Sequence, residues 1–237
     1  MLEIGKRILN DEKVSLCFFG DSITEGCFEF NDDFSDTSFK RDLGYPYKLQ
    51  TLIKERLNKD VHIINAGKSG NNTVKALRRF NSDVLSRKPD FCLVMFGSND
   101  VVNIEWGEFD QDTYLNNMTY IFNTLKLNNI EIACMTPSMM ATEDKGTLKD
   151  TKYYDMLQDC IKIQTSGVVD KFFLDLKDLC TKLNVPVIDV YSIWKKKYAE
   201  GEDVTSLLSN DINHPNEIMH EVFAEEIYKK MFNDETK

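Results

Sequence analysis

Short runs of apolar residues alternate along the chain with longer segments in which apolar residues recur at helical spacing. The short runs are apolar on both faces, which is typical of strands buried in a parallel sheet. We predict strands at 14–19, 61–66, 91–96, 130–135 and 187–190. Helices are predicted at 45–57, 73–85, 113–127 and 217–232, with a mainly helical stretch at 151–183.

Strands that alternate with helices imply right-handed crossovers and a parallel sheet covered on both faces. The chain has no internal repeat and no linker-like tract, so we expect a single domain over residues 1–237. The main irregular segment is 27–44, which is polar with interspersed aromatic residues. Two interpretations of it stay open: a surface excursion, or a wall or lid of the binding cleft.

The composition is that of an ordinary globular protein, with 42% hydrophobic and 29% charged residues among 237. The net charge of −10 makes nucleic acid and anionic membranes poor partners, because like charges repel. The basic pairs and triplets at Arg78-Arg79 and Lys195–Lys197 are interpreted as solvated helix faces.

The cysteines and the N-terminus both bear on location. Cys17, Cys92 and Cys134 fall inside apolar runs, where a free thiol behaves as a small hydrophobe, and no Cys-x-x-Cys pair occurs. This pattern fits a reducing compartment. The sequence contains no signal-peptide pattern and no apolar stretch long enough to span a bilayer, so a cytoplasmic protein is expected.

Polar clusters follow three of the predicted strands. They read GDSITEG at 20–26, NAGKSGN at 65–71 and GSND at 97–100, and a fourth, DINHP at 211–215, precedes the last helix. In open parallel sheets, ligands bind beyond the carboxyl ends of the strands. These clusters are therefore the places where a site is expected.

The clusters contain every part that acyl transfer needs. Ser22 lies in a small-residue turn as a candidate nucleophile, and His214 stands in a loop as the candidate base, with Asp211 as the carboxylate that orients it. Gly67 offers a backbone N–H and Asn99 a side-chain amide to a developing oxyanion. Ser69 and Ser98 are rival nucleophiles, but neither lies in the turn after the first strand.

Taken in order, GDSITEG, NAGKSGN, GSND and DINHPN resemble the four signature blocks of the SGNH hydrolases, the GDSL-like lipase/acylhydrolase family. The resemblance runs from about Phe19 to Phe232. It implies a flavodoxin-like, three-layer α/β/α sandwich around a five-stranded parallel sheet. It also implies that Ser22 attacks an ester, that His214 takes its proton and that Asp211 orients His214. The oxyanion hole would consist of the N–H groups of Ser22 and Gly67 and the Asn99 amide, with no metal and no cofactor.

The chain departs from the family pattern in two places. Met219 stands where the family often carries Gly, and segment 27–44 matches no block, so substrate preference is not carried over. The surroundings of Ser22 also lack the G-x-S-x-G elbow of ordinary α/β-hydrolases.

The other polar candidates have structural explanations. We expect Asp21 to support the Ser22 turn by hydrogen bonding to backbone. His62 is expected to be packed within a strand and His220 to be structural on the last helix.

The sequence thus predicts a serine esterase acting on a short- or medium-chain acyl ester of a sugar, a lipid or a small alcohol. The alternative is a non-catalytic carbohydrate- or nucleotide-binding domain on the same fold. With Asp211 beside it, the pKa of His214 is expected at the ordinary ~6.5 or somewhat above.

Overall fold

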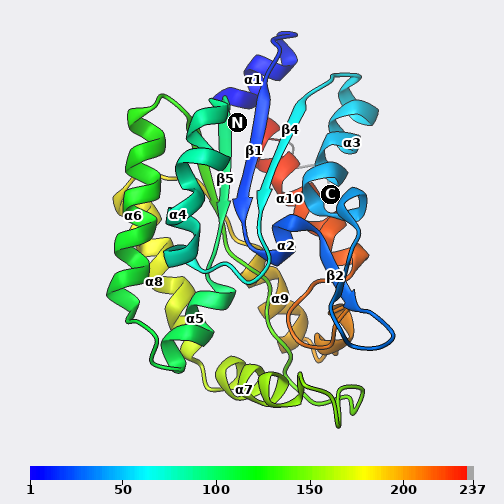
Figure 1. The fold of residues 1–237 in the computed structure, drawn as a ribbon. Coiled ribbons are helices and arrows are strands. Elements are labelled where there is room, and N and C mark those ends of the chain that lie inside the picture. The colour runs from blue at the N-terminus through cyan, green and yellow to red at the C-terminus, as the bar shows by residue number, and fades with distance from the viewer. Residues whose placement is uncertain (234–237) are drawn as a thin grey trace.

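The computed structural model describes residues 1–233, and its centre is a five-stranded parallel sheet (Figure 1). Along the sheet the strands run in the order β4-β1-β5-β6-β7. Their bounds are Ser15–Gly20 for β1, His62–Gly67 for β4, Phe91–Met95 for β5, Glu131–Met135 for β6 and Val187–Ile188 for β7. Renumbered within the sheet this is the order 2-1-3-4-5, which confirms the flavodoxin-like α/β fold.

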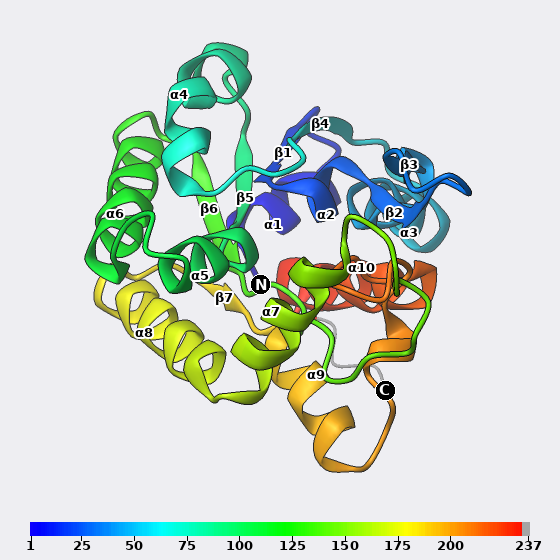
Figure 2. The same ribbon diagram turned by 60° about the horizontal axis from the view of Figure 1, so that its bottom comes forward.

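Helices cover both faces of this sheet (Figure 1). One layer contains α4 (Thr73–Asp83), α6 (Gln111–Leu127) and α8 (Val168–Lys182). The other contains α1 (Glu3–Leu9), α3 (Tyr45–Leu57) and α10 (Glu217–Phe232). Three further helices, α5 (Ser98–Glu105), α7 (Tyr154–Thr165) and α9 (Val190–Ala199), lie toward the carboxyl ends of the strands (Figure 2).

Helix boundaries follow from side chains that accept the first backbone N–H groups. Asn72 caps α4 as its sequence suggested, accepting from Lys75 N. Helix α6 begins at Gln111, before the predicted start at 113, because the Asp110 side chain accepts from Thr113 N and caps the helix. Strand β7 stops at Ile188, short of the predicted 190, because the Asp189 side chain accepts from Ser192 N and starts α9.

Segment 27–44 is a folded hairpin instead of an irregular loop. Its strands β2 (Cys27–Phe30) and β3 (Thr37–Phe39) pair antiparallel, and a short 3-10 helix follows at Arg41–Leu43. The Phe30 ring stacks on Tyr153 with centroids 4.0 Å apart. The aromatic residues of this segment therefore attach the hairpin to the start of α7.

The layers enclose one continuous apolar core that includes the thiols. All six cysteines are free and buried, as the apolar runs around three of them suggested. Among the helices of residues 1–233, none combines the length and apolarity needed to cross a membrane.

Strands β1, β4 and β5 end at the same edge of the sheet. The short helix α2 (Ser22–Glu25) follows β1 at this edge, and α5 follows β5. The chain segment before α10 also crosses this edge, close to the β2–β3 hairpin (Figure 2). The polar clusters of the sequence therefore meet in one place.

Gly5 marks the closest approach of α1 to α10. A Cβ built on Gly5 would lie 2.2 Å from the backbone oxygen of Met231, which also accepts a hydrogen bond from Leu2 N. We therefore expect Gly5→Ala to lower the free energy of unfolding by about 1–3 kcal/mol, although alanine is intrinsically the better helix former. Urea denaturation with Lys6→Ala as the exposed control measures this, and an unchanged or higher midpoint for Gly5→Ala would contradict it.

Candidate active site

Ser22 and His214 meet at the carboxyl edge of the sheet. The Oγ of Ser22 lies 3.0 Å from Nε2 of His214, a residue 192 positions away along the chain. Both side chains are buried, with 5% and 6% of their residue surface exposed. A hydroxyl and an imidazole at this distance can exchange a proton directly.

The turn that carries Ser22 is fixed from below by Asp21. Its Oδ1 accepts the backbone N–H of Ile23, which makes Asp21 the cap of α2. Burial raises the pKa of this carboxyl to about 7; the hydrogen bond from Ile23 N lowers this pKa in part, and the charge of Asp100 raises it. Asp21 thus supports the turn that carries Ser22 through a hydrogen bond to backbone, as expected from the sequence.

Asn210 shapes the loop that presents His214. Its Oδ1 accepts backbone N–H groups from Ile212, Asn213 and His214. The loop closes through an isolated bridge between Leu208 and Pro215, directly before the N-cap residue of α10. This compact turn holds the imidazole over the end of β1.

The other ring nitrogen of His214 faces a backbone carbonyl. Nδ1 lies 2.9 Å from the oxygen of Phe28, on strand β2. Asp211, predicted for this position, is elsewhere: it adopts a left-handed conformation with φ of 56°, and its Oδ2 accepts a hydrogen bond of 2.6 Å from Thr147 Oγ1. The structure therefore joins Ser22 to His214 but directs the Asp211 carboxylate to a different partner.

Burial lowers the pKa of His214 to about 4, and the hydrogen bond to the Phe28 carbonyl offsets only part of that effect. The expectation of about 6.5 or above depended on a carboxylate at Nδ1. With a neutral carbonyl there instead, removal from water dominates and the imidazole stays neutral over most of the acidic range.

The candidate oxyanion donors belong to the segments at the ends of β1, β4 and β5. Gly67 N, predicted as a donor, already donates to Asn65 Oδ1 at 2.9 Å. Gly67 is instead required sterically, because a Cβ there would lie 2.2 Å from Glu25 N. Within residues 1–233, the backbone N–H groups of Ser22 and Gly70 have no protein acceptor.

Asn99 stands at the start of α5 across from the Gly70 loop. Its Nδ2 donates to the carbonyl oxygen of Asn71 at 3.0 Å, which uses one of the two amide hydrogens. The same bond couples α5 to the loop after β4. Gly70 has a φ of 67°, and nothing lies within 4 Å of its Cβ position. Glycine is therefore favoured there by the left-handed backbone conformation and not by a lack of space.

The remaining serine and histidine candidates lie outside this arrangement. Ser69 is exposed, and Ser98 is buried at the first position of α5. His62 is exposed at the first position of β4, so the expectation that it is packed within a strand is wrong. His220 is fully buried, and its Nδ1 accepts the backbone N–H of Tyr45.

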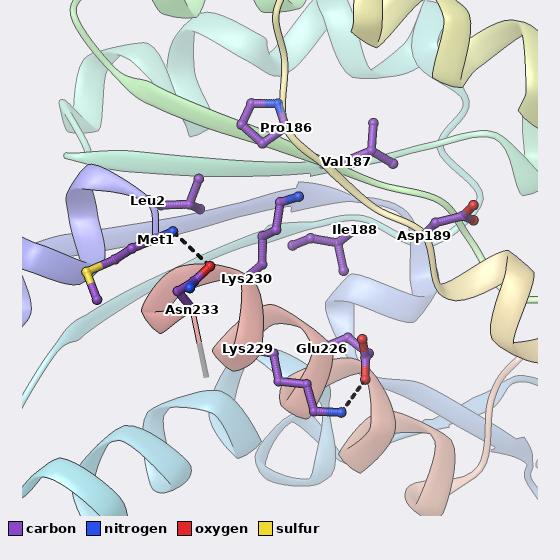
Figure 3. Close-up of a pocket in the computed structure, with 10 residues that line it drawn as sticks. All are labelled: Met1, Leu2, Pro186, Val187, Ile188, Asp189, Glu226, Lys229, Lys230 and Asn233. Atoms are coloured by element: carbon purple, nitrogen blue, oxygen red, sulfur yellow. Dashed lines mark hydrogen bonds and ion pairs between the residues drawn. The ribbon is translucent and has the colours of Figure 1, made fainter. Parts of the chain in front are cut away.

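Two cavities differ in their relation to the site. One of about 520 Å³ lies at the sheet edge between β7, the N-terminus and the end of α10, and contains none of the candidate site residues (Figure 3). Another of about 320 Å³ adjoins the loop of His214 and the hairpin. Its lining comes from three segments: Glu29, Phe30, Asn31, Asp32 and Phe34; Thr147 and Leu148; and Ser209, Asn210 and Asp211.

Two features of this site had no distinct sequence signal. Any residue has a carbonyl, so nothing in the sequence marked Phe28 as the partner of His214. Gly70 lies in the same block as Gly67, and only backbone geometry separates a bonded N–H from a free one. For metals, residues 1–233 contain no group of three His, Cys, Asp or Glu side chains placed to hold an ion.

Comparison with known proteins agrees with the fold and the motifs. The chain is 27% identical over 179 residues to an uncharacterized lipoprotein of Bacillus subtilis, YqeF, covering 72% of this chain and 68% of that one. Its fold is similar to that of an acetyl xylan esterase, AlAXEase, at 22% identity and a TM-score of 0.67, covering 92% of this chain and 99% of that one. A variant of Axe2, an acetyl xylan esterase from Geobacillus stearothermophilus, matches at 19% identity and a TM-score of 0.69, covering 94% and 97%.

The family comparison covers most of the protein. Residues 18–222 match the GDSL-like lipase/acylhydrolase family, a span that contains Ser22, Asn99 and His214. The five-stranded parallel sheet flanked by helices agrees with the fold of the structural neighbours. The chain therefore belongs to the GDSL-like lipase/acylhydrolase family of esterases.

Proposed function

We propose that this protein hydrolyses carboxylic esters through an acyl-enzyme on Ser22. The observation that carries the proposal is the 3.0 Å contact between Ser22 Oγ and His214 Nε2. A nucleophile and a base in direct hydrogen-bond contact, in a buried turn at the ligand-binding edge of the sheet, are the minimum for covalent acyl transfer. A module that only bound carbohydrate or nucleotide would have no need of this pair.

The reaction follows from the positions of the two side chains. Nε2 of His214 accepts the proton of Ser22 Oγ as the oxygen attacks the ester carbonyl carbon. The tetrahedral intermediate collapses, and Nε2 returns the proton to the departing alcohol oxygen. Nε2 then deprotonates a water molecule that attacks the acyl-enzyme, and the proton passes back to Ser22 as the acid is released.

The carbonyl of Phe28 takes the role that the sequence assigned to Asp211. An N–H at Nδ1 donates to this oxygen, which leaves the lone pair of Nε2 directed at Ser22. A carbonyl fixes the tautomer and the ring orientation as a carboxylate does. It carries no net charge, so it stabilises the transient imidazolium less.

For the oxyanion we propose three donors: the backbone N–H groups of Ser22 and Gly70 and the side-chain amide of Asn99. The support is that both N–H groups lack a protein acceptor and that Asn99 keeps one amide hydrogen free. Gly67, the donor expected from the sequence, is replaced by Gly70 because its own N–H is bonded to Asn65.

The alcohol part of the ester is proposed to lie toward the hairpin. The leaving oxygen must lie near His214 to receive its proton, and the 320 Å³ cavity adjoins the loop of His214 at Asn210 and the hairpin at Phe30 and Phe34. Glu29, Asp32 and Asp211 make its lining acidic, so a neutral or cationic alcohol fits and a phosphorylated one does not. An acetylated carbohydrate, the substrate named for the two structurally similar xylan esterases, satisfies this requirement. A cytoplasmic location stays a prediction, and the relative YqeF is named a lipoprotein.

The first test removes the nucleophile. Ser22→Ala is expected to abolish hydrolysis of p-nitrophenyl acetate and of an ester panel, with a loss on the order of 10⁴-fold or more in kcat. Ser69→Ala, at the exposed rival serine, serves as the matched control and is expected to keep wild-type rates. A fluorophosphonate probe should label the wild type at Ser22.

Equal rates for Ser22→Ala and the wild type, or labelling of another serine, would remove Ser22 from the mechanism. Saturable binding of a sugar or nucleotide by a wild type that hydrolyses no ester in the panel would favour the binding module instead.

A second test separates the carbonyl from the carboxylate. Because Asp211 bonds Thr147 and not His214, Asp211→Asn is expected to change kcat/KM by less than about threefold, as is the control Thr147→Val. Loss of a carboxylate that orients a catalytic histidine costs on the order of 10⁴-fold. A fall of that size in Asp211→Asn, with Thr147→Val unaffected, would show that the Asp211 carboxylate and not the Phe28 carbonyl orients His214.

The pH dependence gives a third test. The free enzyme needs neutral His214, so kcat/KM is lost as pH falls through the pKa of this group, about 4. Between about pH 7.5 and pH 5.5 the rate constant should therefore stay nearly flat, whereas a pKa of ~6.5 would lower it about tenfold. Steady-state rates with circular dichroism as a check on folding measure this, and a tenfold fall with intact structure would contradict the lowered pKa.

A further inference from the structure

Arg79 on α4 is largely buried, whereas its sequence neighbour Arg78 is exposed. The sequence suggested that Arg78 and Arg79 both belong to a solvated helix face, and Arg78 is indeed exposed. The side chain of Arg79 is only 15% exposed, with its guanidinium carbon 4.9 Å from the centroid of the Phe19 ring. The interpretation of Arg79 as a surface residue is therefore wrong.

The guanidinium reaches three points at the carboxyl edge of the sheet. Nη2 donates to the carbonyl oxygen of Gly20 at 2.8 Å, at the end of β1. Nη1 donates to the carbonyl oxygen of Ala66 at 2.6 Å, near the end of β4. Nε donates to Oδ1 of Asn71 at 2.7 Å, in the loop that follows β4.

Two of these points are close in sequence to groups of the proposed reaction. Gly20 is two residues before Ser22, and Asn71 directly follows Gly70. The carbonyl oxygen of Asn71 also accepts the amide of Asn99 at 3.0 Å. One side chain is thus bonded to the nucleophile turn and, through Asn71, to both of the other oxyanion donors.

We propose that Arg79 is a positioning residue that fixes the oxyanion donors of the Gly70 loop and Asn99 relative to Ser22. The inference rests on the proposed esterase function. Its physical basis is that an oxyanion hole acts only when its donors are held about 3 Å from the developing charge before the reaction begins. Two loops at the ends of different strands have no such fixed spacing unless a rigid group joins them.

Arginine suits this position because its donors form a planar fork. Three different acceptors are bonded at once by Nε, Nη1 and Nη2, and the stack on Phe19 holds the plane. A lysine ammonium is a single point of charge and would satisfy fewer of these acceptors. Nη1 also forms an ion pair with Asp83 at 3.1 Å, and this pair does not account for the other three bonds.

The experiment compares adjacent arginines on the same helix. Arg79→Met is expected to lower kcat for p-nitrophenyl acetate about 10²-fold with KM within about threefold. The reason is that a misplaced oxyanion donor weakens binding of the transition state much more than binding of the substrate. Arg78→Met, the matched control, should keep wild-type kcat. Arg79→Lys should recover only a small part of the loss, and Asp83→Asn should be close to wild type.

A purely structural role would give a different pattern. Added guanidinium at millimolar concentration, far below denaturing levels, should raise the kcat of Arg79→Ala while leaving Arg78→Ala and Ser22→Ala unchanged. Wild-type kcat in a folded Arg79→Met, or a lowered kcat in Arg79→Ala that guanidinium does not raise, would overturn the proposal.

A crystal structure of Arg79→Met keeps this proposal separate from the esterase function. Arg79 as a positioning residue requires the contact between the Asn71 carbonyl and the Asn99 amide, or its placement relative to Ser22, to change in the variant. An unaltered arrangement would overturn the role of Arg79 whatever the activity. Absence of hydrolysis by the wild type over the whole ester panel would instead count against the proposed function.

Discussion

The hydrogen bond between Ser22 and His214 joins residues 192 positions apart, and it exists only because α10 packs against α3. Helix α10 buries Phe223, Ile227 and Met231 along its inner face. Burial of three such side chains contributes several kcal/mol, at roughly 1.5–3 kcal/mol for each. That packing places the start of α10 at the carboxyl edge of the sheet, so the loop before it has to cross the end of β1. The geometry of the site is therefore a consequence of the packing of one helix layer.

The hairpin at 27–44 also contributes to the position of His214. Its first strand supplies the carbonyl of Phe28 that faces Nδ1 of His214, and its Phe30 ring stacks on Tyr153 at the start of α7. A backbone acceptor is held by the strand itself, so its position depends on the hairpin as a unit and not on one rotamer. Both interpretations of this segment thus hold in part: it lies over the surface, and it contacts His214.

The sequence predicted what depends on side-chain type and periodicity. The five main strands and helix α3 are periodic or uniformly apolar, and their limits were predicted to within a few residues. Ser22 and His214 were predicted to meet because few side chains can serve as nucleophile and base, and the structure places them in contact. Helix α9 was missed because it follows a two-residue strand directly, and its start depends on the Asp189 cap.

The rest of the site depends on atoms that the sequence does not distinguish. A carbonyl acceptor has no residue signature, which is why the partner of His214 was assigned to Asp211 and not to Phe28. Gly67 and Gly70 differ only in whether their N–H is already bonded. Arg79 was grouped with Arg78 as one charged helix face because the two are adjacent in the sequence. Adjacent residues are about 100° apart around a helix, so one can face solvent while the other faces the protein.

Burial has the same effect on three ionisable groups near Ser22, because it favours the neutral form of Asp21, Asp100 and His214. It raises the pKa of Asp21 to about 7 and that of Asp100 to about 6, and it lowers that of His214 to about 4. The carboxyls contribute stability that is full below their ordinary pKa near 3.8 and is lost as pH rises toward 7. His214 has the opposite dependence, because its contribution is full above 6.5 and is lost as pH falls toward 4. Arg79 differs from these three groups because its guanidinium stays charged, and its charge lowers the pKa of Asp21. A permanently charged group persists there because backbone carbonyls, an amide oxygen and an aromatic face replace the water that it lost.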